Sequence, residues 1–165
     1  MLVTTELAWY VAHTRPRCEK KLARYCAREN LAVTLPCYQS VKKYRGKKVV
    51  FEKPLFPNYL FLQLLPEQTR KVYQSDYVAN LLDVTDQKLF EEQLGDILLA
   101  LDSDAEVYLA PYITTGSKVR IKSGPLRGVE GFVEQRAGQM MVILRLDFIT
   151  QAAAVKIEAT DLELI

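Results

Sequence analysis

Residues 53–65 read KPLFPNYLFLQLL, and this stretch decides the organisation of the first part of the chain. Within it leucines alternate with aromatic residues, as Leu60, Leu62 and Leu64 against Tyr59 and Phe61. Successive side chains of a β-strand point to opposite faces, so both faces of this predicted strand are apolar. The run ends at a proline, far short of the roughly 18 apolar residues that a membrane-spanning helix needs. The strand is therefore buried on both sides, or it keeps one face for a partner.

The segments around this strand predict an α+β pattern. Residues 8–14, AWYVAHT, are rich in aromatic and β-branched residues, which is typical of a strand. Thr14 and Pro16 then favour the start of a helix that is predicted to run to about residue 30, with cysteine and leucine on one face and cations on another. The remaining elements are predicted as a hairpin over 41–53 turned at Gly46, a helix over 66–75, a strand over 77–84 and a helix after residue 85. This order indicates helices packed on a mainly antiparallel sheet.

The C-terminal third has a different texture. Residues 102–106, DSDAE, interrupt the helical pattern and begin a predicted linker. Short strands punctuated by glycine follow over about fifty residues, which is typical of a small closed barrel. The predicted domains are therefore residues 1–103 and 115–165, joined by a linker at 104–114.

Charge is distributed unevenly along the chain. Residues 1–53 hold 12 basic and 4 acidic side chains, whereas residues 54–165 hold 10 basic and 16 acidic ones. The formal net charge of +2 thus combines a balance of +8 with one of −6. Such polarity suits a basic surface that meets a polyanion, while the rest of the molecule meets a different partner. The alternative for this charge distribution is an accident of surface composition, and the alternative for the basic helix is a solvated face with no ligand.

The sequence offers little for catalysis. It has one histidine and three cysteines with no C-x-x-C pair, and it has no G-x-S-x-G, Walker-type or H-E-x-x-H motif. The cysteine spacing matches no zinc knuckle or ribbon. We therefore expect a protein that is not an enzyme, with no catalytic residues, metal or cofactor. The N-terminus lacks the build of a signal peptide, so we expect a soluble, cytoplasmic protein.

Three motifs carry a resemblance to a known family. Residues 116–133, GSKVRIKSGPLRGVEGFV, resemble a KOW motif. Residues 9–11, WYV, followed by a basic helix with EKK at 19–21, resemble the opening of the NusG N-terminal domain. The stretch KPLFPNYLF at 53–61 resembles that domain's most recognisable motif, in the form found in RfaH and other specialised paralogues. Together the motifs cover nearly the whole chain, which is identified as a member of the NusG/RfaH family.

The resemblance implies a fold and a function. The N-terminal domain is an antiparallel sheet with packed helices, and the KOW domain is a small SH3-like β-barrel. Such a factor acts in transcription elongation and antitermination: it binds the clamp helices of the RNA polymerase β′ subunit and the upstream non-template DNA, and it suppresses pausing and termination. The KOW domain recruits ribosomal protein S10 or Rho. We expect a monomer that does not meet a membrane.

The resemblance also implies site residues. The polymerase-binding residues are Phe56, Pro57, Tyr59 and Phe61. The nucleic-acid-binding residues are His13, Arg15 and Lys21, which match family positions, and Arg17, Lys20 and Arg24, which extend that surface. A base would stack on His13 or Tyr25. Phe148 and Ile149 are the residues that bind the partner of the KOW domain.

Several alternatives stay open at the level of sequence. A ribosome- or RNA-associated KOW protein that never meets polymerase is the rival function. A specialised paralogue is favoured over a housekeeping factor by the form of the central motif, but target operons and any recruitment sequence are not readable. The barrel is favoured for the KOW segment, with a helix over 151–159 as the alternative that a fold-switching or autoinhibited relative would adopt.

Overall fold

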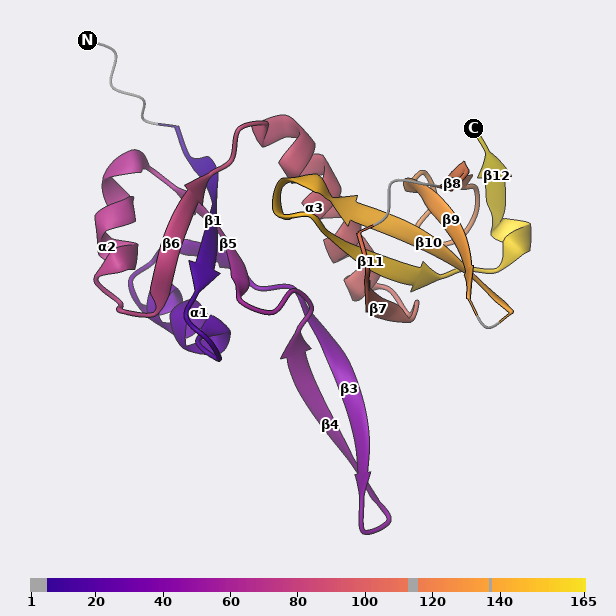
Figure 1. The fold of residues 1–165 in the computed structure, drawn as a ribbon, viewed down its shortest axis with the longest axis horizontal. Helices are drawn as coiled ribbons and strands as arrows, with labels where there is room; N and C mark the ends of the chain where they lie inside the picture. The colour runs from indigo at the N-terminus through magenta and orange to yellow at the C-terminus, as the bar shows by residue number, and fades with distance from the viewer. Residues whose placement is uncertain (1–5, 113–115, 137) are drawn as a thin grey trace. The chain divides into compact units, whose positions relative to one another are not determined.

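A computed structural model gives the fold of the chain and describes residues 6–112, 116–136 and 138–165 (Figure 1). The chain divides into two compact units. The first comprises Met1–Cys37 and Phe56–Lys88, and the second comprises Tyr38–Leu55 and Leu89–Ile165. Within the described residues, no helix combines the length and the apolar character that crossing a membrane requires.

The first unit is a four-stranded antiparallel sheet with two helices. Its elements are β1 (Ala8–Thr14), α1 (Glu19–Arg28), β2 (Ala32–Thr34), β5 (Tyr59–Leu64), α2 (Thr69–Tyr73) and β6 (Val78–Asp83). The strand order is β2-β5-β1-β6, so the apolar strand β5 lies inside the sheet beside β1. The predicted strands at 8–14 and 59–64 therefore form the centre of the unit.

One face of this sheet carries the core of the unit. Leu60, Leu62 and Leu64 pack with Leu22 and Cys26 of α1, and all five are fully buried. Leu22 and Cys26 are four residues apart and thus share one helical face. Cys26 is thus a core residue, and its burial raises the pKa of the thiol to about 11. The three cysteines are free thiols.

Left-handed backbone positions set both ends of α1. Arg17 has φ 61°, which is incompatible with a helical turn, so the helix begins at Glu19 and not directly after Pro16. At the other end Asn30 has φ 58°, and the amide of Leu31 donates to the carbonyl of Cys26 at 2.9 Å. This is the usual way for a helix to end on a left-handed asparagine.

The second unit contains the hairpin, the long helix and the C-terminal strands. Its elements are β3 (Cys37–Tyr44), β4 (Lys47–Pro54), α3 (Gln87–Asp102), β7 (Val107–Ala110), β8 (Lys118–Ile121), β9 (Glu130–Arg136), β10 (Gln139–Leu146), β11 (Gln151–Lys156) and β12 (Leu162–Leu164). The strands β7 to β12 form one six-stranded sheet in the order β12-β8-β9-β10-β11-β7. The strands β3 and β4 form a separate two-stranded sheet.

The structure resolves one open point in the C-terminal part. Residues Gln151–Lys156 form a strand that pairs with β10, so the helical alternative for this segment is wrong. The segment expected as a linker contains β7, which pairs with β11. The expected end of that linker at residue 114 and the start of the next domain at 115 lie outside the described residues. The α+β class with mainly antiparallel sheets is confirmed, and the domain boundaries stay predictions.

Candidate functional site

A tight turn precedes β5 and presents part of the predicted polymerase-binding motif. Pro57 and Asn58 occupy its two central positions, and Asn58 has φ 70°. The amide of Tyr59 donates to the carbonyl of Phe56 at 3.2 Å. Proline followed by a left-handed asparagine is the arrangement of a type II turn. The motif therefore places Pro57 at the exposed tip and returns the chain directly into the sheet.

Glu19 of α1 holds this turn, a role that the sequence analysis missed. Its Oε2 accepts a hydrogen bond from the amide of Asn58 at 3.3 Å, and its side chain is buried. The carbonyl of Asn58 accepts in turn from the amide of Thr14 at the end of β1, at 2.9 Å. The turn is thus bonded to both elements that carry the predicted nucleic-acid-binding residues. Glu19 is the one acidic residue of α1, beside four cations, and this contrast was the feature of the sequence that could have indicated its separate role.

The four predicted polymerase-binding residues differ in accessibility. Phe56 and Phe61 are buried, with 1% and 0% of their surface exposed, and their rings meet edge to face at a centroid distance of 6.3 Å. Tyr59 is half-buried and Pro57 is exposed. The apolar second face of β5 is therefore covered at Phe61 in this structure. Direct contact with a partner is open to Pro57 and Tyr59.

The two predicted surfaces meet at a single ring contact. His13 of β1 and Tyr59 of β5 are opposite each other in the antiparallel register. Their rings stack with centroids 5.3 Å apart and an interplanar angle of 29°. His13 is exposed, so the stack has a solvent-facing side. Sequence reasoning selected both residues, but only the register shows that they touch.

The predicted nucleic-acid-binding residues are all exposed: His13, Arg15, Arg17, Lys20, Lys21 and Arg24. They follow one another from the end of β1 into the first turns of α1. Arg15 forms an exposed ion pair with Asp76 at 3.3 Å, which offsets part of its charge. Tyr25 is different, because its hydroxyl donates to the carbonyl of Lys71 at 2.7 Å and its ring is half-buried. Of the two residues considered for base stacking, His13 is the more accessible one.

The two predicted KOW partner-binding residues are both at least half-buried, and one of them contacts α3 of the same unit. The ring of Phe148 meets that of Phe90 edge to face at 6.3 Å, and Ile149 is buried. Beside them, Gln93 donates through Nε2 to Asp147 at 2.8 Å and accepts from the Asp147 amide at 2.9 Å. Phe148 is half-buried, so part of its ring is open to solvent.

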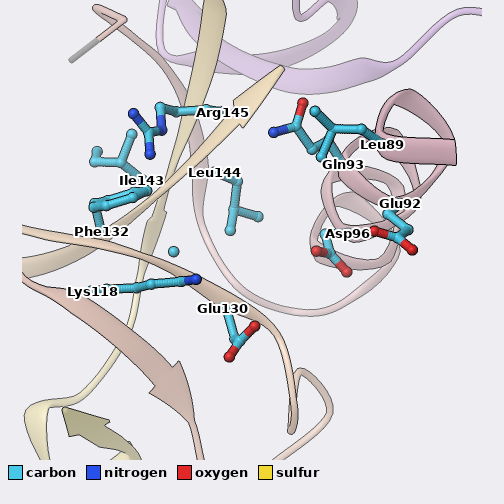
Figure 2. Close-up of a pocket in the computed structure, with 11 residues that line it drawn as sticks. Leu89, Glu92, Gln93, Asp96, Lys118, Glu130, Phe132, Ile143, Leu144 and Arg145 are labelled. Atoms are coloured by element: carbon cyan, nitrogen blue, oxygen red, sulfur yellow. The ribbon is translucent and has the colours of Figure 1, made fainter. Parts of the chain in front are cut away.

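A cavity of about 310 Å³ lies between α3 and the C-terminal sheet (Figure 2). Three carboxylates line it: Glu92 and Asp96 from the helix and Glu130 from β9. Burial raises the pKa of Asp96, and repulsion from Glu92 and Glu130 raises it further. Among the described residues, no group of three or more His, Cys, Asp and Glu side chains is arranged to hold a metal ion.

A family model described as "Transcription termination factor nusG" matches residues 7–93. The match covers more than half of the chain, including β1, α1, β5 and the turn that joins them. The chain belongs to the NusG family. All the predicted polymerase-binding and nucleic-acid-binding residues lie within the matched range, whereas the KOW segment lies beyond it.

Curated relatives in the NusG family extend the similarity over most of the chain. The transcription termination/antitermination protein NusG of Rickettsia conorii is 27% identical over 145 residues, covering 77% of this chain and 73% of the relative. The NusG proteins of Borreliella burgdorferi and Rickettsia typhi are each 26% identical, over 152 and 145 residues. These alignments cover 76% and 77% of this chain and 80% and 73% of the relatives.

Proposed function

We propose that this NusG-family chain is a transcription elongation and antitermination factor. In this proposal it binds the clamp helices of the RNA polymerase β′ subunit through the turn before β5, and the upstream non-template DNA through the start of α1. The observation that carries the proposal is the stack of His13 on Tyr59, at 5.3 Å. It makes the two predicted surfaces neighbours, as a factor that bridges polymerase and its DNA requires.

The burial of the aromatic residues divides the polymerase-binding motif into two roles. Pro57 and Tyr59 are accessible, and they are the proposed contacts with polymerase. Phe56 and Phe61 are buried against each other, so they support the turn from beneath. An aromatic anchor at the centre of an interface commonly accounts for about 2 kcal/mol of binding free energy. Tyr59 is the residue of the motif that fits this role.

The exposed cations give the proposed DNA surface its character. Arg15, Arg17 and Arg24, with the lysines between them, neutralise backbone phosphates, which gives affinity with little sequence information. His13 adds a ring on which an unpaired base stacks. The support for this role is the exposure of all six side chains and their continuity from β1 into α1. Suppression of pausing follows in this proposal from holding polymerase and the non-template strand together.

The KOW domain is proposed to recruit a second partner, ribosomal protein S10 or Rho. The residues offered are Phe148 and Ile149, at the short 3₁₀ segment before β11. Phe148 is half-buried against Phe90, and Ile149 is buried. Recruitment through Phe148 therefore competes with its contact with Phe90 of α3.

Binding to purified core RNA polymerase tests the proposal. We expect Tyr59→Ala to weaken binding by about 2 kcal/mol, which is roughly 30-fold in Kd. Tyr108→Ala is the matched control, because Tyr108 is an exposed tyrosine on β7 and is predicted to leave binding unchanged. Phe61→Leu keeps an apolar side chain in the buried position and is expected to bind almost as the wild type does.

Three outcomes would contradict parts of this proposal. Equal binding by the wild type and Tyr59→Ala would move the polymerase contact away from Tyr59. Stronger loss in Phe61→Leu than in Tyr59→Ala would show that Phe61 contacts polymerase directly. If the wild-type chain does not bind polymerase and instead co-sediments with ribosomal subunits, the result would favour a ribosome- or RNA-associated KOW protein.

A further inference from the structure

The hairpin β3–β4 is an isolated two-stranded ribbon with no core of its own. Its strands form a separate sheet, and every residue from 41 to 52 is exposed (Figure 1). Arg45 and Gly46 form its two-residue turn, both with positive φ, at 49° and 80°. A two-stranded hairpin alone is only marginally stable in water. The side chains of this ribbon are thus presented to solvent and contribute little to folding.

The two-residue turn fixes which side chains share a face. Tyr44 and Lys47 flank the turn and lie opposite each other, and side chains alternate outward from this pair. We call one side of the ribbon the tyrosine face, which consists of Tyr38, Ser40, Lys42, Tyr44, Lys47, Val49, Phe51 and Lys53. One contact joins two members of this face: the rings of Tyr44 and Phe51 meet edge to face at 6.4 Å.

The ribbon carries a concentrated positive charge. Between Cys37 and Pro54 there are six cations and one carboxylate, which is a balance of +5. The nearby Lys42 lowers the pKa of Lys53, because two ammonium groups repel each other. An anion bound among the lysines of the ribbon reduces such repulsion. The phosphates of a nucleic acid are anions of this kind.

The aromatic residues on the same face narrow the choice of polyanion. Tyr44 is 52% exposed and Phe51 is 39% exposed, so ring surface is open beside the lysines. The bases of a duplex are stacked on one another and are not available to exposed rings, whereas the bases of a single strand stack on aromatic side chains. Tyr38, Ser40 and Tyr44 add hydroxyl groups, which are suited to hydrogen bonding with the 2′-hydroxyl of RNA.

We propose that the tyrosine face of the β3–β4 ribbon binds single-stranded RNA. The lysines of this face, Lys42, Lys47 and Lys53, contact the phosphates, and Tyr44 and Phe51 stack on the bases. This inference goes beyond the proposed function, which assigns DNA to His13 and α1 of the first unit. It concerns a different surface and a different strand, and its test contains no polymerase.

The opposite face of the ribbon supplies a matched control. Lys43 and Lys48 lie next to the turn and point away from the tyrosine face, with the same charge as Lys42 and Lys53. Lysines also protect exposed strands from edge-to-edge aggregation, and that role makes no distinction between the two faces. The comparison of the two lysine pairs therefore separates a binding face from a ribbon that is merely soluble.

Binding of the full chain to a labelled single-stranded RNA of about 12 nucleotides tests the proposal, by fluorescence anisotropy. We expect Lys42→Gln/Lys53→Gln to weaken binding roughly tenfold or more. We expect Lys43→Gln/Lys48→Gln to weaken it less than about threefold, through long-range charge alone. Tyr44→Ala/Phe51→Ala is expected to lose about tenfold or more through stacking. The exchange Tyr44→Phe/Phe51→Tyr retains an aromatic ring at both positions and is expected to keep most of the wild-type affinity.

The same measurements identify the result that would overturn the inference. Equal losses of RNA affinity in the two lysine double variants would show that the ribbon attracts RNA only through its total charge and has no binding face. Single-stranded DNA of the same sequence bound as tightly as the RNA, or a duplex bound more tightly than either, would reject RNA as the ligand. The lysine variants keep the ribbon's apolar and aromatic residues, so loss of RNA binding in them does not depend on whether the alanine variant folds.

Discussion

At Gly131 the C-terminal sheet has no space for a side chain. A Cβ at this position of β9 would lie 2.6 Å from Cγ1 of Val142 and 2.7 Å from the carbonyl oxygen of Ile143, both on the neighbouring strand β10. We therefore expect Gly131→Ala to lower the free energy of unfolding by about 1–3 kcal/mol through overpacking. Chemical denaturation of the full chain, followed by circular dichroism, measures this change.

Gly95 offers the matched substitution in open space. It lies within α3, and a Cβ there would meet no atom within 4 Å. Because alanine is the better helix former, Gly95→Ala is expected to raise the free energy of unfolding by about 0.8–1 kcal/mol. The two substitutions add the same methyl group, but they are expected to change the free energy of unfolding in opposite directions. A Gly131→Ala variant as stable as the wild type would show that β9 and β10 separate easily at this point.

The carboxylates of α3 and β9 that line the cavity are expected to make the stability of the second unit depend on pH. The pKa of Asp96 is raised in the folded chain, first by burial and then by Glu92 and Glu130. The folded state thus binds this proton more tightly than the unfolded state does. Protonated Asp96 therefore stabilises the fold. This stabilisation is fully present below the ordinary pKa of 3.8, and it is lost as the pH rises through the higher pKa of Asp96 in the folded chain. At neutral pH the ionised Asp96 is therefore destabilising.

Asp96→Asn removes this ionisation while keeping the size of the side chain. We expect the variant to melt at a higher temperature than the wild type at pH 7, and the advantage to shrink as the pH approaches 4. Asp104→Asn, at an exposed position after α3, serves as the control and is expected to leave the melting temperature almost unchanged. An advantage of Asp96→Asn that is the same at both pH values would point to packing and not to charge.

Element by element, the strong periodic segments were predictable from sequence, whereas three of the shortest strands were not. The strands at 8–14 and 59–64 were predicted at their observed bounds. The strands β2, β7 and β12 have only three or four residues each, and their pairing with β5, β11 and β8 defines them. Period alone cannot reveal such partners. The start of α1 was predicted too early, because the left-handed backbone of Arg17 has no signal in composition.

The candidate site was predictable in its residue types but not in its contacts. Exposure of the cations follows from their stripe along the helix. Because both faces of β5 are apolar, the sequence did not decide whether Phe61 is buried or exposed. In the structure Phe61 is buried. The hydrogen bond from Asn58 to Glu19 joins residues 39 positions apart, which local sequence rules do not reach.

On the scale of the whole molecule, the distribution of charge matters more than its sum. The net charge of +2 would give only weak attraction to DNA if the chain acted as a uniform sphere. The balance of +8 within residues 1–53 instead concentrates cations at the start of α1 and on the ribbon. Association with nucleic acid is then expected to depend on local phosphate contacts and the counterions they release.

The salt dependence of binding to single-stranded DNA distinguishes attraction by the net charge from local phosphate contacts at the start of α1. Lys21→Gln/Arg24→Gln removes two cations from the proposed DNA surface, so the slope of log affinity against log salt is expected to fall by about 1.4, at about 0.7 per phosphate contact. Asp104→Asn/Glu158→Gln changes the net charge by the same amount in the other direction, at exposed positions of the second unit. This control is expected to keep the wild-type slope. A slope that follows net charge in both variants would remove the case for a DNA surface at the start of α1, because the cations there would then act only through their contribution to the total.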